Sequence, residues 1–168
     1  MVLQSLPVER QAVSIITSRF QITGHLETIG VPFNFVNDAG RNSLSIHDAY
    51  LAPLTPGGPL KGFSRPHIVI RRSAIVFLYF ASAETRASVR TRRRKELLVA
   101  YTEVAVCRGY FHMADEAEVN DFLDDVAGAL LPITETKVFP LVELPAPFPA
   151  EADLLLVGLS HLQFYHRA

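Results

Sequence analysis

The chain has 168 residues, of which 49% are hydrophobic, and its formal net charge at pH 7 is −1. This length allows one or two small domains. No run of eighteen apolar residues is present, which argues against a membrane span, and the first residues lack the basic start and apolar stretch of a signal peptide. With Cys107 as its single cysteine, the chain cannot form an internal disulfide, and we expect a cytoplasmic protein.

Several stretches of the chain recur at a nearly constant spacing. Residues 17–26 (TSRFQITGHL) and 102–111 (TEVAVCRGYF) lie eighty-five positions apart. The pairs 46–54 with 133–141 and 73–77 with 160–164 lie eighty-seven positions apart. Similar order and spacing predict a tandem duplication. We expect a first β-repeat at 1–83, a basic linker at 84–96 and a second β-repeat at 97–168.

Each repeat is predicted to open with a β-hairpin. In the first repeat, Val13 and Ile15 alternate with smaller or polar residues, which is the period of a half-buried strand. Residues 17–19 are expected to form the turn. A glycine inside a strand marks a bulge or a close backbone approach, so Gly24 and its counterpart Gly109 predict a bent strand in both repeats.

The region after the hairpin differs between the repeats. Residues 31–36 in the first repeat are predicted to form a single helical turn. In the second repeat, four apolar residues lie on one helical face: Val119, Phe122, Leu123 and Val126. Asp115 and Glu118 resemble an N-terminal cap, and Gly128 can end the helix.

A third strand, a proline-containing loop and a last β-hairpin are predicted to close each repeat. The strands are expected at 44–51 and 131–139, and the hairpins pair 67–70 with 74–80 and 154–157 with 161–166. Five strands and a short helical piece per repeat predict a small, bent antiparallel sheet or barrel. We therefore expect a mainly β protein made of two tandem repeats, with a short helix at least in the second.

This pattern of strands resembles Sm-like and SH3-like small barrels, and the tandem uncharacterised β-rich domains found in bacteria. The resemblance covers both repeats and rests on the order of strands rather than on a signature motif. It implies a fold and assigns no catalytic residue.

The segment at 86–95 (RASVRTRRRK) has six basic residues and no acidic one, whereas residues 96–168 are strongly acidic. The six residues are Arg86, Arg90, Arg92, Arg93, Arg94 and Lys95. Such a cluster is typical of nucleic-acid binding. Because it lies between the repeats, a solvated linker, pairing with the acidic second repeat and contact with a partner protein are alternative interpretations.

No motif in the chain predicts a catalytic, cofactor or metal site. His47 and Asp48 are neighbours on a predicted strand and therefore point to opposite faces. The six histidines lack the spacing of a metal site, and the glycine-rich phosphate loops and nucleophile elbow are absent. We expect Cys107 to be a buried core residue.

These features together favour a non-catalytic interaction or assembly subunit. Such a subunit docks into a larger protein complex or self-assembles through its duplicated β-lobes, so we expect a protein partner or a homo-oligomer, with no cofactor. One alternative is a nucleic-acid-binding protein that uses the arginine-rich segment. The other is an enzyme with a cleft between the lobes, a place that ligand sites favour.

Overall fold

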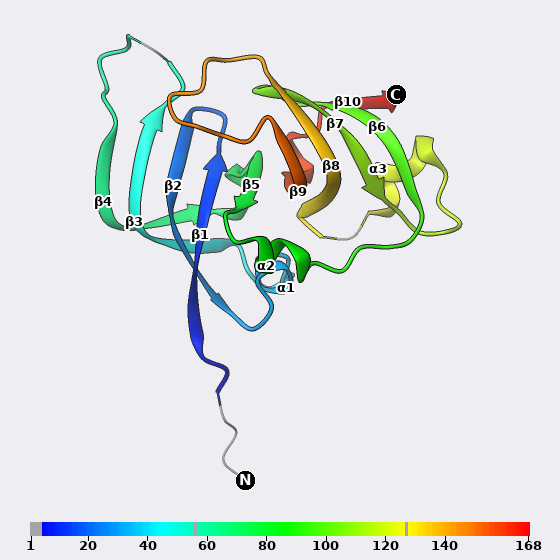
Figure 1. Cartoon of the computed structure of the whole chain (residues 1–168), viewed down its shortest axis with the longest axis horizontal. Coiled ribbons are helices and arrows are strands. Elements are labelled where there is room, and N and C mark those ends of the chain that lie inside the picture. The colour runs from blue at the N-terminus through cyan, green and yellow to red at the C-terminus, as the bar shows by residue number, and fades with distance from the viewer. Residues whose placement is uncertain (1–4, 56, 127) are drawn as a thin grey trace.

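The computed structural model describes residues 5–55, 57–126 and 128–168. Ten antiparallel strands form a single sheet (Figure 1), which confirms the expected mainly β fold. In chain order they are β1 (Val8–Ile16), β2 (Phe20–Ile29), β3 (Ser43–Pro53), β4 (Phe63–Arg71), β5 (Phe77–Phe80), β6 (Lys95–Tyr101), β7 (Ala105–His112), β8 (Leu130–Pro140), β9 (Glu151–Gly158) and β10 (Phe164–Arg167).

The helices are short and lie in the connections between strands. They are α1 (Pro32–Val36), α2 (Ala83–Ala87), α3 (Phe122–Asp125) and the 3-10 turns η1 (Arg72–Ala74), η2 (Val119–Asp121) and η3 (Leu159–His161). None of the helices within the described ranges has the length and apolar character needed to cross a membrane.

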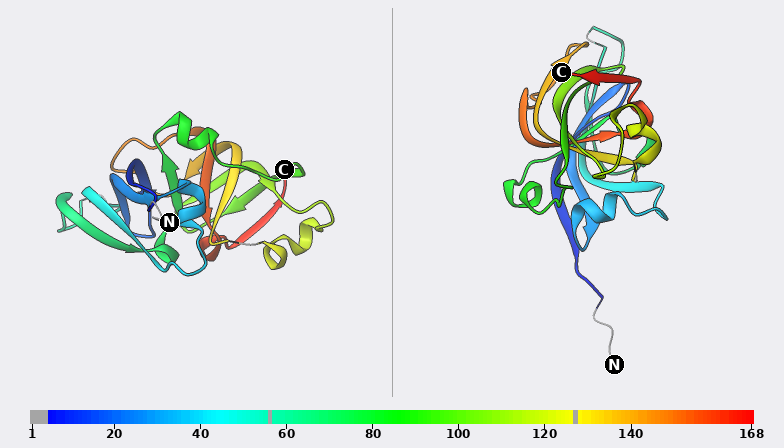
Figure 2. Two further views of the ribbon diagram at one scale, coloured as in Figure 1. Left: turned by 90° about the horizontal axis from the view of Figure 1, so that it is seen from below. Right: turned by 90° about the vertical axis from the view of Figure 1, so that its right-hand side faces the viewer.

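The two halves of the chain pair their strands in the same order. The first half is arranged β5-β1-β2-β3-β4 and the second β10-β6-β7-β8-β9. Because β5 also pairs with β9, the halves join into one continuous sheet instead of two separate barrels. The strands β4 and β10 are left as its unpaired edges, toward opposite ends of the long axis (Figures 1 and 2).

Both predicted opening hairpins are confirmed, with the same turn chemistry in each half. β1 pairs with β2, and β6 pairs with β7. The Thr17 hydroxyl accepts a hydrogen bond from the Phe20 backbone N–H at 3.0 Å. The Thr102 hydroxyl accepts one from Ala105 at 3.1 Å. A threonine that closes its own turn in this way explains why the strands reverse at these two places.

The predicted bend at each strand glycine is also present. The register between β2 and β3 shifts between Thr23 and His25, and that between β7 and β8 shifts between Arg108 and Tyr110. A Cβ on Gly24 would lie 2.7 Å from the Ile46 Cγ2 atom, and one on Gly109 would lie 2.6 Å from the Ile133 Cγ2 atom. Only glycine permits the neighbouring strand to approach so closely.

Two details of the sequence-based prediction are wrong. The closing strands do not form hairpins, because β4 pairs with β3 whereas β5 pairs with β1 and β9. Likewise β9 pairs with β8 and β5, and β10 pairs with β6. After the 3-10 turns η1 and η3, the chain crosses to the opposite edge of the same five-stranded half. A turn sequence does not reveal this, because the partner of a strand is chosen by long-range burial.

The predicted helix over residues 119–126 is shorter than expected. It consists of η2 followed by the four residues of α3. The N-cap is Glu118 for η2 and Asp121 for α3 instead of Asp115, and neither makes a side-chain cap bond. Val119 and Phe122 are nevertheless buried, as their spacing indicated. The single helical turn predicted at 31–36 is confirmed as α1.

The two halves share their hydrophobic interior. Ile16, Leu54 and Phe77 of the first half pack in the cluster that contains Leu98 and Leu155 of the second half. In the other direction, three residues of the second half pack into the cluster of the first: Leu130, Leu154 and Leu156. Each fully buried large apolar side chain contributes about 1.5–3 kcal/mol, so the halves stabilise one another.

Candidate docking surface

The basic segment runs from α2 through a loop to the start of β6, and two of its six cations are used inside the protein. The Arg86 side chain donates hydrogen bonds to the carbonyl oxygens of Phe80 (2.8 Å) and Ala81 (2.9 Å). It also pairs with Asp153 at 2.7 Å. The guanidinium therefore joins α2 to β9, across the boundary between the halves.

Arg94 holds the loop that follows β7. Its Nη1 atom donates to the carbonyl oxygens of Ala114 (3.0 Å), Asp115 (3.1 Å) and Ala117. Its Nη2 atom lies 3.4 Å from the carboxylate of Glu96. Arg94 thus binds mainly backbone carbonyl groups. The Arg86–Asp153 ion pair is the contact between the basic segment and an acidic residue of 97–168.

The other four basic residues are exposed: Arg90, Arg92, Arg93 and Lys95. Lys95 is on β6 with its ammonium 4.3 Å from the centre of the Tyr110 ring. The other three lie in the loop between α2 and β6. The structure therefore leaves a smaller cationic surface than the sequence indicated.

A cavity of about 170 Å³ lies between α1 and the second half. Phe33, Phe122 and Leu131 supply apolar walls, and Arg90 and Arg92 border it. His112 is the one imidazole among the described lining residues, which include no carboxylate. Both of its ring nitrogens have partners, at 2.7 Å from the Arg92 carbonyl oxygen and 2.8 Å from the Thr134 hydroxyl.

Three histidines that are far apart in the sequence lie side by side on β2, β3 and β4. His25 pairs with His47, and His47 pairs with His67. The His47 ring stacks on His67 with 4.8 Å between centroids, and its Nε2 atom is 2.7 Å from a Glu27 carboxylate oxygen. Within the described part of the chain, no three His, Cys, Asp or Glu side chains have the geometry to hold a metal ion.

The most distinctive surface is a row of side chains across the second half. Directly paired residues on β10, β6, β7 and β8 form it: Phe164, Tyr101, Val106 and Phe139. Paired residues of neighbouring strands point to the same face. Leu141 follows at the end of β8, where its backbone N–H donates to the Val104 carbonyl oxygen at 2.8 Å. We call these five residues the terminal row.

The first half has a row in the corresponding places. Its members on β5, β1, β2 and β3 are Phe77, Ile16, Gln21 and Ala52. Leu54 follows at the end of β3, and its backbone N–H donates to the Arg19 carbonyl oxygen at 2.9 Å. We call these five residues the junction row.

The second half covers the junction row. The loop between β8 and β9 reaches over β1 and β2 (Figure 1), and the Gln21 amide donates to the carbonyl oxygens of Ala146 (3.1 Å) and Pro147 (3.3 Å). The Gln21 carbonyl oxygen accepts the Ala146 N–H at 3.1 Å. Phe148 packs on Phe77 with 6.4 Å between ring centroids.

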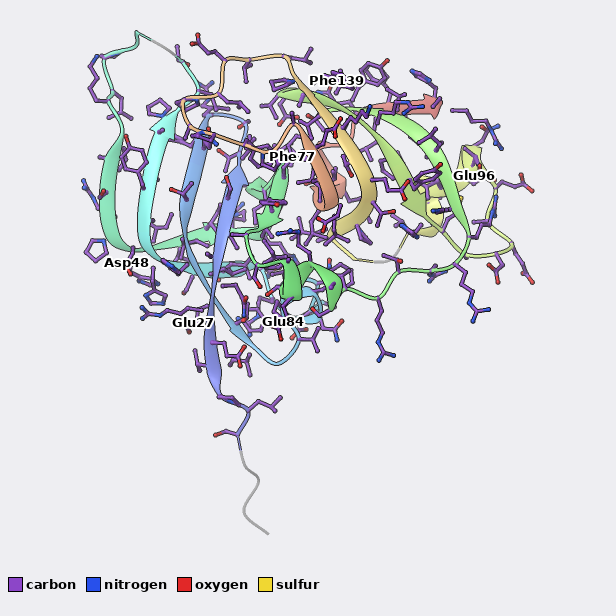
Figure 3. All side chains as sticks on the ribbon, in the orientation of Figure 1. Glu27, Asp48, Phe77, Glu84, Glu96 and Phe139 are labelled. Atoms are coloured by element: carbon purple, nitrogen blue, oxygen red, sulfur yellow. The ribbon has the colours of Figure 1, made fainter. Side chains whose placement is uncertain are left out.

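The terminal row has no such cover. Phe164 is 57% exposed and Phe139 is 52% exposed, whereas Phe77 and Ala52 in the corresponding places are 0% and 5% exposed. Leu141 is 61% exposed and Leu54 only 7%. Figure 3 shows Phe77 near the centre of the molecule and Phe139 at its upper edge. Tyr101 and Val106, between the two phenylalanines, are half-buried. Large apolar side chains exposed close together are typical of an interaction surface.

Cys107 lies beneath this surface, in the middle of β7. It is fully buried in the core of the second half. Burial raises the pKa of its thiol to about 12, because the thiolate would lose its hydration. The thiol is therefore unreactive in the folded protein, in keeping with the core position expected from the sequence.

Comparison of the chain with protein-family models, curated proteins and solved structures finds no match.

The terminal row was missed in the sequence although Phe77 and Phe164 occupy matching places in the recurring segments 73–77 and 160–164. The two phenylalanines have the same local sequence position and the same strand pairing. They differ in exposure because the β8–β9 loop covers Phe77 and not Phe164. The residues around each phenylalanine do not predict this.

Proposed function

We propose that the chain is a non-catalytic assembly subunit that arose by tandem duplication of one β-unit. Recurring sequence segments, identical pairing order and matched glycine bends support the duplication. Each copy has a row of side chains in equivalent places, which begins on β5 in the first copy and on β10 in the second. The first copy buries its row against the second, and the second copy uses its row for a partner protein.

One observation carries this proposal: the terminal row is exposed where the junction row is buried. Burial of a large apolar side chain contributes about 1.5–3 kcal/mol, whereas association costs about 4–15 kcal/mol in lost translational and rotational freedom. Full burial of Phe139, Leu141 and Phe164 would together contribute about 4.5–9 kcal/mol, which at best roughly offsets that cost. The unpaired edge of β10 beside them supplies further contacts.

A photo-crosslinking residue placed in the row tests this function. Benzoylphenylalanine at position 139 or 164, introduced in cells that make the protein, should give discrete crosslinked products on irradiation. The same residue at Val69, an exposed apolar position on the opposite edge strand β4, is the matched control and should give few. If positions 139 and 164 crosslink no more than position 69, the terminal row is not a docking surface.

Nucleic-acid binding through the basic loop is the second candidate. The exposed side chains of Arg90, Arg92 and Arg93 favour it, since three cations of one loop can contact phosphates. Replacement of these three by Gln should then weaken RNA or DNA binding and flatten its dependence on salt. Affinity and salt slope that stay the same in the triple variant would remove this candidate.

A further inference from the structure

The two unpaired edges of the sheet differ in chemistry. The β4 edge has Arg65, Pro66, His67 and Arg71. Proline removes a backbone donor, and charged side chains on an edge strand oppose pairing with another strand. The β10 edge (FYHR) has no proline, and its first residue, Phe164, belongs to the apolar terminal row. Its one arginine, Arg167, is at the end of the strand and pairs with Glu96 at 3.3 Å. We therefore consider β4 closed to strand addition and β10 open to it.

The pairing of β5 with β9 shows which kind of strand can be added beside β5, the strand of the first half that corresponds to β10. On β9, Val157 pairs with Phe77, and Leu156 pairs with Leu78. The Gly158 N–H then donates to the Val76 carbonyl oxygen at 2.8 Å. A Cβ on Gly158 would overlap the carbonyl oxygen of Ile75, so this place tolerates no side chain.

The residue of β4 that corresponds to this glycine is Arg71. Arg71 pairs with Ser43 at the start of β3, as Gly158 pairs with Leu130 at the start of β8. Their backbone angles also agree, at φ −69°, ψ 127° for Arg71 and φ −66°, ψ 118° for Gly158. If β4 of one copy paired with β10 of another, the Arg71 side chain would therefore overlap the backbone at Leu162, just before β10. The β4 strand of a second copy thus cannot pair with β10 in the way that β9 pairs with β5.

We propose that β10 and the terminal row bind an apolar β-strand of a different protein, antiparallel to β10, with a glycine beside Leu162. By the junction register, one apolar residue of that strand lies opposite Phe164 and the preceding one lies opposite Tyr165. Main-chain hydrogen bonds supply affinity in such strand addition, and the alternate side chains supply specificity. This inference rests on the proposed docking function of the terminal row.

A peptide with the sequence of residues 151–159 (EADLLLVGL) serves as the probe, because it is the strand that β5 accepts. Fluorescence anisotropy with a labelled peptide and the full-length protein should show saturable binding. The peptide with Gly158→Arg, which copies the arrangement on β4, should not bind. In the protein, Phe164→Glu should weaken binding about tenfold or more, whereas Val69→Glu on the β4 edge should leave it unchanged.

The outcomes separate this inference from the function on which it rests. If the peptide does not bind, or if both peptides bind equally, strand addition at β10 is wrong, while crosslinking at position 164 still tests docking. If the purified protein is an oligomer that Phe164→Glu dissociates, the occupant is a second copy, and only the partner inference fails. A monomer that binds the glycine peptide through Phe164 supports the inference.

Discussion

The two halves of the sheet bend in the same places and differ in what covers them. Gly24 and Gly109 let neighbouring strands approach to the same degree, and Asp48 and Glu135 opposite them share φ angles of 50°. On these common frames, the junction row is buried and the terminal row is exposed. The two halves thus share their backbone geometry where the steric limits are tight, whereas the burial of a strand face depends on a loop from elsewhere in the chain.

The largest expected difference between the halves concerns the paired phenylalanines. Phe77→Ala should destabilise the protein by about 3–5 kcal/mol, since it leaves a cavity between the two halves. Phe164→Ala should cost less than about 1 kcal/mol, because the ring is exposed and loses mainly its stacking on Tyr101. Urea denaturation of both variants measures the two costs. Equal costs would mean that the two rows are buried alike.

The glycine and arginine at the ends of β9 and β4 form a second matched pair. Gly158→Ala should cost about 3 kcal/mol, because the new Cβ meets the rigid carbonyl of Ile75. Arg71→Ala should change stability by less than about 0.5 kcal/mol, as expected for an exposed edge residue. The same denaturation assay reads both, and a tolerated alanine at position 158 would contradict the steric argument against β4.

The basic segment should separate into structural and exposed cations. Arg86→Ala should cost about 1.5–3 kcal/mol, because two backbone carbonyls and Asp153 lose their charged donor. Arg93→Ala should have almost no effect on the free energy of unfolding. If both changes leave the denaturation midpoint in place, Arg86 does not join the halves.

The smallest expected effect lies at the shared bulge. Glu135→Gly should stabilise the protein by about 1 kcal/mol, because a side chain with φ of 50° is strained and glycine is not. Asp48→Gly should gain less, since aspartate tolerates this backbone region better than glutamate does. Thermal denaturation, with Glu135→Ala as the control that keeps the strain, measures the gain. Destabilisation by Glu135→Gly would show that the backbone there is not strained.

The sequence predicted the features of this fold that depend on neighbouring residues. Alternation around Val13 and the threonine turns located the opening hairpins, and the strand glycines located the bends. The partners of β5 and β10 were not predictable, because η1 and η3 have the length of hairpin turns yet lead across the sheet. The pairing of β5 with β9 accompanies the burial of Phe77 and Leu78 between the halves, which is a long-range effect.

The candidate site was predicted only in part. The basic cluster could be recognised from the composition of residues 86–95. The hydrogen bonds that Arg86 and Arg94 make inside the protein could not, because their acceptors are carbonyl groups of other segments. The terminal row combines residues from four strands, and none of them stands out in its own segment. The β8–β9 loop covers Phe77 and leaves Phe164 uncovered, and this depends on contacts between distant parts of the chain.

The central claim is that a partner covers the terminal row in the cell. Single cysteines in place of Phe164 and, as the control, Val69 can be labelled with a membrane-permeant maleimide, and the buried Cys107 adds no background. Both should react quickly in the purified protein, and in intact cells only position 164 should become slow. If position 164 reacts as quickly in cells as in the purified protein, nothing covers the row and the account is wrong.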